Sequence, residues 1–173
     1  MRPIVAELAA NLGLEPHPEG GFFRETYRAA ETVQTSRGAR VASTAILFLV
    51  TVAAISHLHR LSSDELWVFQ GGLPLELVTL SPGGDLGVHM LGDTTGGARE
   101  AGEAEVTPQA LVPAGSWQGA RLAGGPHLPA ARAWALVSCI VSPGFEYEDF
   151  ELGERDALLA VYPEHAQVVT AFT

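Results

Sequence analysis

The sequence predicts a single all-β domain with short helices near its two ends. The chain has 173 residues, the length of one domain, and its content of 47% hydrophobic and 17% charged residues is typical of a folded globule. From Phe23 onward, short runs rich in valine, isoleucine, leucine and aromatic residues alternate with turns that contain glycine and proline. We find no linker or internal repeat, so we expect one domain over residues 1–173.

A first helix is predicted over residues 3–12. Pro3 suits its first turn and Gly13 suits its C-cap. Its apolar residues recur at helical spacing and form one stripe, which consists of Ile4, Val5, Leu8 and Leu12. Two short helical turns are expected near the other end, over residues 154–159 and 163–168.

Strands are expected in between. Residues 44–50 are apolar without alternation, which predicts a strand buried on both faces. Residues 75–80 and 86–91 flank the turn sequence Ser-Pro-Gly-Gly-Asp and predict a hairpin. Residues 92–105 and 124–129, which are rich in glycine and other turn formers, are expected to be loops.

Charge and composition exclude several classes of partner and chemistry. A net charge of −10 argues against a nucleic-acid or membrane partner, because both require a cationic surface. All ten basic residues are arginine, so lysine Schiff-base chemistry is excluded. The longest apolar run, residues 45–55, is too short to span a bilayer, and no secretory signal pattern is visible, so we expect a cytoplasmic protein. Cys139 is the only cysteine and lies in an apolar run that predicts a buried, unreactive thiol.

The pair His57-x-His59, followed by Glu65, is the most informative pattern for function. The two histidines point to the same side of a strand, because side chains alternate across the pleat. A bend could return the carboxylate of Glu65 to that face. Imidazole and carboxylate together are typical ligands of transition metals.

Four further segments carry a resemblance to a known family: residues 17–28, 64–67, 112–118 and 142–150. Together with His57-x-His59 they resemble the DUF985 family of RmlC-like proteins in the cupin superfamily. The resemblance extends from about residue 4 to about residue 165. It implies a double-stranded β-helix, the cupin jelly-roll barrel, in place of other β-sandwiches. It also implies a homodimer in which N-terminal strands contribute to the partner's sheet.

The resemblance implies a set of metal ligands as well. The first cupin motif supplies three ligands and the second, Pro-x-Gly-x-x-His, supplies a fourth. The corresponding residues here are His57, His59, Glu65 and Gln118, with glutamine in the place of the last histidine. The expected cofactor is a divalent ion, Zn, Fe, Mn or Ni, although an amide oxygen is a weaker donor than imidazole. Some cupins have lost the metal and use the barrel mouth for acid–base work or for binding, and then no cofactor is expected.

Glu65 is the leading candidate for acid–base catalysis, with His59 beside it. Glu65 shares a strand face with Trp67 and Phe69, so desolvation should raise its pKa unless a cation such as Arg60 neutralises it. Trp67, and Trp117 next to Gln118, are candidate stacking residues for a planar or sugar-like ligand, with core packing as the alternative.

Tyr27 is a second catalytic candidate. In the strand of residues 24–28, alternation places Glu25 and Tyr27 on the face opposite to Arg28, where they could enter the barrel lumen. Tyrosine serves as a proton donor to a carbanion in RmlC-type epimerases, which the chain resembles. The alternative is that Glu25 and Arg28 form structural hydrogen bonds at a subunit contact. His17 is expected to be exposed and uninvolved.

Two functions remain open from the sequence. The first is an enzyme that acts on a small polar metabolite, by isomerisation or epimerisation through proton transfer or by metal-assisted chemistry. The second is a non-catalytic small-molecule binder that serves as a sensor or storage protein. Both need a ligand pocket lined by His57, His59, Glu65 and Gln118, and a fold alone does not choose between them.

Overall fold

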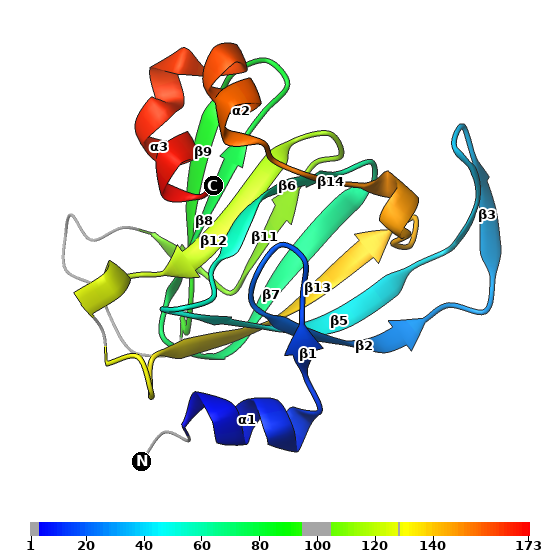
Figure 1. Cartoon of the computed structure of the whole chain (residues 1–173). Helices are drawn as coiled ribbons and strands as arrows, with labels where there is room; N and C mark the ends of the chain where they lie inside the picture. The colour runs from blue at the N-terminus through cyan, green and yellow to red at the C-terminus, as the bar shows by residue number, and fades with distance from the viewer. Residues whose placement is uncertain (1–3, 95–104, 128) are drawn as a thin grey trace.

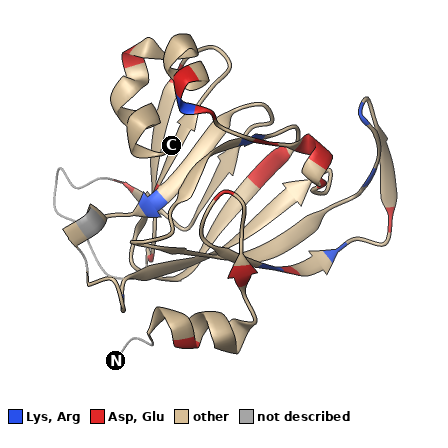
Figure 2. Cartoon of the chain, in the orientation of Figure 1, with Lys and Arg blue, Asp and Glu red and all other residues tan. Residues whose placement is uncertain are grey.

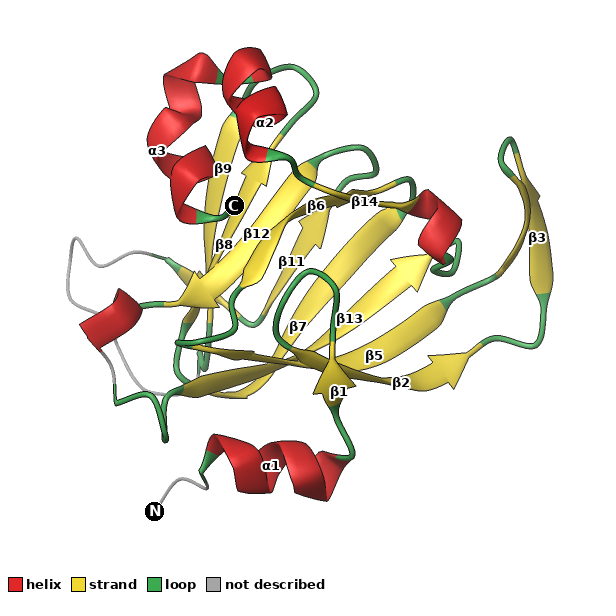
Figure 3. Ribbon diagram, viewed as in Figure 1, coloured by secondary structure: helices red, strands yellow, loops and turns green. Residues whose placement is uncertain are grey.

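The computed structural model describes residues 4–94, 105–127 and 129–173, and in them two six-stranded sheets face each other (Figures 1 and 3). The first sheet has the order β1 (Glu15–Pro16), β2 (Phe22–Arg28), β5 (Thr44–Thr51), β13 (Trp134–Ser142), β7 (Asp64–Gly72) and β11 (Gln109–Val112). The second has the order β10 (Val106–Thr107), β9 (Leu86–Leu91), β8 (Leu75–Leu80), β12 (Trp117–Leu122), β6 (Ser56–Leu61) and β14 (Phe150–Leu152). A separate hairpin consists of β3 (Thr32–Thr35) and β4 (Gly38–Val41). The fold is the predicted all-β jelly-roll sandwich.

The strand pairing explains the apolar patterns. β5 lies between β2 and β13, and none of its eight residues is exposed, as its continuous apolar run predicts. β13 lies between β5 and β7, and the buried thiol of Cys139 is in its middle. β8 and β9 pair as the predicted hairpin, with Leu80 opposite Leu86 across the turn.

Two apolar clusters form the core. The larger cluster lies between the sheets and includes Phe48, Trp67 and Val137. The second includes Leu58, Leu158 and Phe172 and connects β6 to the C-terminal helices α2 (Arg155–Val161) and α3 (Ala166–Ala171). These helices lie over the second sheet (Figure 1). Because Leu58 faces the helices, its neighbours on β6, including His59, face the space between the sheets.

The other predicted elements are present within the described ranges. The first helix, α1 (Val5–Leu12), ends at Gly13, whose φ of 62° is the left-handed conformation that favours glycine at a C-cap. The 3₁₀ turns are η1 (Gly125–His127), η2 (Tyr147–Asp149) and η3 (Pro163–His165). Most of the predicted loop of residues 92–105 lies outside the described residues. Among the described residues, the helices are all too short or too polar to cross a membrane.

We expect the chain to form a homodimer. No residue of α1 is buried, and Tyr27 on β2 is 55% exposed. Beyond Phe23, β2 pairs only with β5 among the described strands, so the rest of its outer edge is open. A second copy on this edge would cover both surfaces. Light scattering at micromolar concentration should report twice the chain mass of 18.3 kDa. A monomer at the highest soluble concentration would contradict this expectation.

Candidate functional site

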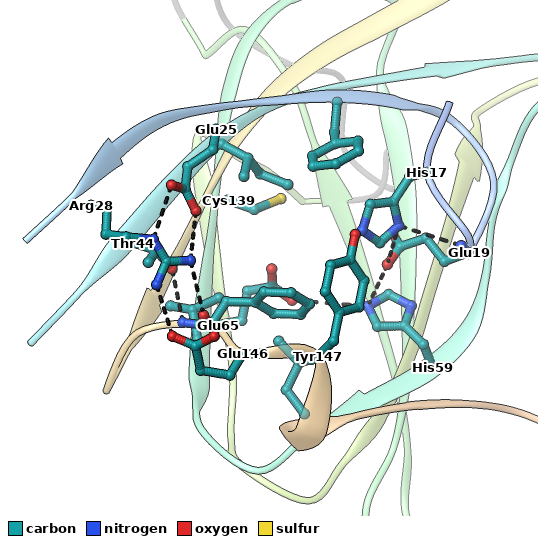
Figure 4. A pocket seen from close by; sticks show the side chains of 15 residues that line it. His17, Glu19, Glu25, Arg28, Thr44, His59, Glu65, Cys139, Glu146 and Tyr147 are labelled. Carbon is teal, nitrogen blue, oxygen red and sulfur yellow. Dashed lines mark hydrogen bonds and ion pairs between the residues drawn. The ribbon is translucent and has the colours of Figure 1, made fainter. Parts of the chain in front are cut away.

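A cavity of about 140 Å³ lies between the two sheets and is the candidate site (Figure 4). Its walls come from β2, β5, β7 and β13 of the first sheet and from β6 of the second. Two irregular segments complete it, the loop before β2 and the segment that leads into η2. The lining residues are His17, Glu19, Phe23, Glu25, Arg28, Thr44, Ile46, His59, Leu61, Glu65, Cys139, Val141, Phe145, Glu146 and Tyr147.

Glu65 is held by a buried chain of hydrogen bonds. The Gln118 amide donates from Nε2 to Oε2 of Glu65, and Oε1 of Gln118 accepts from Nε1 of Trp67 at 2.9 Å. Because an indole nitrogen can only donate, this contact fixes the orientation of the amide. Gln118 and Trp67 therefore hold Glu65 from behind, and neither residue lines the cavity.

Burial raises the pKa of Glu65 to about 7. The side chain is only 7% exposed, so desolvation disfavours the carboxylate more strongly than the nearby charge of His59 favours it. Arg60, the cation that could have neutralised Glu65, is paired with Glu151 at 2.6 Å. The raised pKa has the direction that burial beside apolar side chains predicts.

His59 connects two carboxylates. Its Nδ1 donates to the carbonyl of His57 at 2.9 Å, since a carbonyl can only accept. Its Nε2 lies 3.3 Å from Oε2 of Glu19 and 4.0 Å from Oε2 of Glu65. His59 is 2% exposed, and Phe150 stacks on its ring. The imidazole is thus aligned between two acids on the cavity wall.

Glu19 and His17 are site residues that the sequence reasoning missed. Oε1 of Glu19 accepts from Ser56 at 2.8 Å, and Oε2 lies 3.3 Å from Nδ1 of His17. Burial disfavours the carboxylate, but the charge of His59 and the hydrogen bonds from His17 and Ser56 outweigh it, so the pKa of Glu19 lies below its ordinary value. The expectation that His17 is exposed was wrong, because the chain reverses at Gly20 and Gly21, both with positive φ, and buries the histidine.

A second charged group lies at the other end of the cavity. Arg28 donates to both oxygens of Glu25, at 3.0 and 2.9 Å, and to Glu146 at 2.8 Å. Figure 4 shows this group across the cavity from His17, Glu19 and His59. The expectation that Arg28 lies on the face opposite to Glu25 was wrong. The register of β2 against β5 shifts between Glu25 and Tyr27, and this bulge reverses the alternation that follows it.

The same bulge turns Tyr27 away from the cavity, which corrects its expected position in the lumen. The tyrosine that lines the cavity is Tyr147, 56% exposed, whose ring stacks over that of His17. His57 also lies outside the lining, and its Nδ1 donates to the Glu19 carbonyl at 2.7 Å, which supports the loop. Trp117 packs in the second apolar cluster with Arg60 over its ring, because it alternates with Gln118 on β12.

The predicted metal ligands do not form a metal site in this arrangement. Within the described ranges, no group of three or more histidine, cysteine, aspartate or glutamate side chains is placed to hold a metal ion. His59 and Glu65 line the cavity, but His57 and Gln118 do not, and Oε1 of Gln118 accepts from Trp67. The residues as placed therefore do not fit a resident ion, and the metal set of His57, His59, Glu65 and Gln118 stays a prediction.

The two facing sheets and the cavity between them define a cupin. Residues 6–153 match the profile of the Cupin_5 family, described as Cupin superfamily (DUF985), so the chain belongs to this family.

Solved structures agree with this assignment. A hypothetical protein from Leishmania major is 35% identical with a TM-score of 0.84, and the alignment covers 98% of each chain. A protein from Shewanella oneidensis is 36% identical with a TM-score of 0.83, covering 98% of this chain and 97% of that one. A mutant of oxalate decarboxylase from Bacillus subtilis shares the fold at 12% identity and a TM-score of 0.52, over 91% of this chain and 37% of that chain. No protein of curated description matches the chain.

Replacing Glu65 by glutamine should remove a pH-dependent cost of folding. The folded state keeps the proton on Glu65 up to about pH 7, whereas the unfolded chain releases it near 4.5. Over that interval the folded state binds more protons, so Glu65 lowers the free energy of unfolding as the pH rises, by about 3 kcal/mol in total. The free energy of unfolding of Glu65→Gln does not fall in this way. The variant should therefore become more stable relative to the wild type as the pH rises from 4.5 to about 7.

Urea unfolding on either side of that interval measures the effect, provided that both proteins show the same slope against urea. A stability difference between variant and wild type that is equal at both pH values would contradict the raised pKa.

Proposed function

We propose that this chain is an enzyme that moves a proton on a small polar metabolite, in an isomerisation or epimerisation, with Glu65 as the general acid and base. The observation that carries the proposal is the carboxyl of Glu65, buried in the wall of a cavity with a pKa of about 7 and 4.0 Å from Nε2 of His59. A group with a pKa near the working pH both accepts and returns a proton efficiently. Burial of this carboxyl away from the nearby Arg60, which pairs with Glu151, serves proton transfer better than it serves stability.

The size of the cavity supports a small substrate. Its volume of about 140 Å³ is close to that of a protein cavity of about 150 Å³ that binds benzene. A substrate of roughly six to nine non-hydrogen atoms matches this space. Phe23, Ile46, Val141 and Phe145 supply apolar walls that would hold its carbon skeleton and exclude water.

His59 and Glu19 have supporting roles in this proposal. His59 stands between the carboxyls of Glu19 and Glu65, so its charge would stabilise the negative charge that Glu65 acquires when it gives up its proton. Glu19 orients the imidazole from the other side, while the carbonyl of His57 fixes Nδ1. Tyr147, whose side chain lines the same cavity as Glu65, is the candidate second proton donor to the substrate, in place of Tyr27.

Glu65→Gln tests the proposal once a ligand is found by thermal-shift screening of small keto acids, hydroxy acids and amines. The amide keeps the shape and still accepts from Gln118, but it cannot transfer a proton. We expect the turnover rate to fall by about a hundredfold to ten-thousandfold, with a much smaller change in affinity.

Tyr27→Phe is the control for this experiment, because Tyr27 lies outside the cavity, and it should leave turnover unchanged. Turnover that survives in Glu65→Gln would exclude the role given to Glu65. A ligand that binds tightly but is never converted would favour the non-catalytic binder instead.

A further inference from the structure

We infer that the cavity selects a small organic cation, an ammonium or amidinium carried on a compact apolar body, over neutral or anionic molecules of the same shape. This inference rests on the site used in the proposed function and names the chemical class of its ligand. It concerns binding alone and holds or fails independently of turnover.

The positive charge on the cavity wall is already used. The chain has no lysine, and the two lining histidines, His17 and His59, each lie 3.3 Å from Oε2 of Glu19. The remaining cation of the lining is Arg28, the only arginine there. Its guanidinium makes two hydrogen bonds to Glu25, one to Glu146 and one to the carbonyl of Phe145. An anionic ligand could reach this cation only by displacing a carboxylate, so the site gives an anion no ready partner.

Acceptor oxygens, by contrast, remain available inside. Four carboxyl groups line the cavity, those of Glu19, Glu25, Glu65 and Glu146. The residues that the structure describes donate a hydrogen bond to Oε2 of Glu65 but none to its Oε1, although the side chain is only 7% exposed and projects into the cavity (Figure 4). In the same way, Oε1 of Glu146 accepts from Arg28, whereas its Oε2 receives no bond from the described part of the chain.

These two free oxygens mark where a cation would bind. One lies on the buried wall and the other at the partly exposed rim. Figure 2 shows acidic residues at the start of β7 and along η2, and each of these two segments contributes a residue to the lining. The net charge of −10 would further raise the local concentration of a cation.

The rest of the lining suits the body of such a ligand. The rings of Phe145 and Tyr147 pack edge to face with their centroids 5.0 Å apart, and Phe23, which also lines the cavity, packs edge to face on His17 at 4.6 Å. Aromatic faces bind apolar groups and attract cations through their quadrupole. Carboxylates beside aromatic rings form a typical site for organic cations, whereas an anion would be repelled by both.

Three molecules of nearly the same shape test the inference: benzamidine, which is a cation, benzamide, which is neutral, and benzoate, which is an anion. Isothermal titration calorimetry with the full chain above pH 7, where Glu65 is ionised, should show that benzamidine binds at least about tenfold more tightly than benzamide, because charge-assisted hydrogen bonds replace neutral ones. Benzoate should bind most weakly. Equal affinities, tighter binding of benzoate, or no binding of any of the three at millimolar concentration would overturn the inference.

Two variants locate the contact. Glu65→Gln should lower the affinity for benzamidine by about tenfold to a hundredfold. Glu146→Gln, at the exposed rim, should lower it by about twofold to fivefold. Glu151→Gln is the matched control, because it removes another arginine-paired carboxylate that is not part of the lining. If Glu151→Gln lowers the affinity for benzamidine as much as Glu146→Gln does, the binding depends only on the net charge of the protein. That result would overturn the assignment of the site.

None of the three probes needs to be converted for this test. The order of affinities therefore tests the inference even if no turnover is ever found. Turnover of an anionic substrate would contradict the inference about the ligand but would leave the proton-transfer proposal intact.

Discussion

The arrangement of the site depends on the burial of one carboxyl group, that of Glu65. A buried acid needs hydrogen bonds, a counter-charge or a bound proton, since an isolated charge in an apolar interior is costly. Here Gln118 supplies the hydrogen bond, Trp67 fixes Gln118, and His59 supplies a partial counter-charge. The remaining cost keeps the proton on Glu65 up to about pH 7.

The cavity also depends on ion pairs that hold its irregular walls. The segment before β14 contributes Phe145, Glu146 and Tyr147 but has little regular structure. Arg40 donates to both oxygens of Asp149, at 2.7 and 3.1 Å, and Arg37 donates to one of them at 3.1 Å. Hydrogen bonds from Arg40 in particular hold the pKa of Asp149 below its ordinary value. This network joins the β3–β4 hairpin to the segment that forms the front of the cavity.

Strand alternation made part of this site predictable. The inward direction of His59 and the shared face of Glu65 and Trp67 follow from a period of two, and both are found as expected. The continuous apolar run of β5 and the hairpin of β8 and β9 could be read in the same way.

The failures have physical reasons as well. A single inserted residue in β2 exchanged the directions of Tyr27 and Arg28, and no local pattern in the sequence marks this bulge. Trp117 lies on the far face of β12 because adjacent residues of a strand point to opposite sides, so the same alternation excludes it from the site once Gln118 faces Glu65. His17 and Glu19 enter the site through a loop with two glycines at positive φ, and loop direction is not encoded in hydrophobic periodicity.

The most direct test of the account is the titration of Glu65 itself. Carbon-13 NMR of protein labelled at the glutamate carboxyls, with Glu65→Gln to assign the signal, follows its protonation in the folded state. The account predicts a midpoint of about 7. A midpoint at or below the ordinary glutamate value of 4.5 would show that Glu65 is charged at neutral pH and would contradict the central claim.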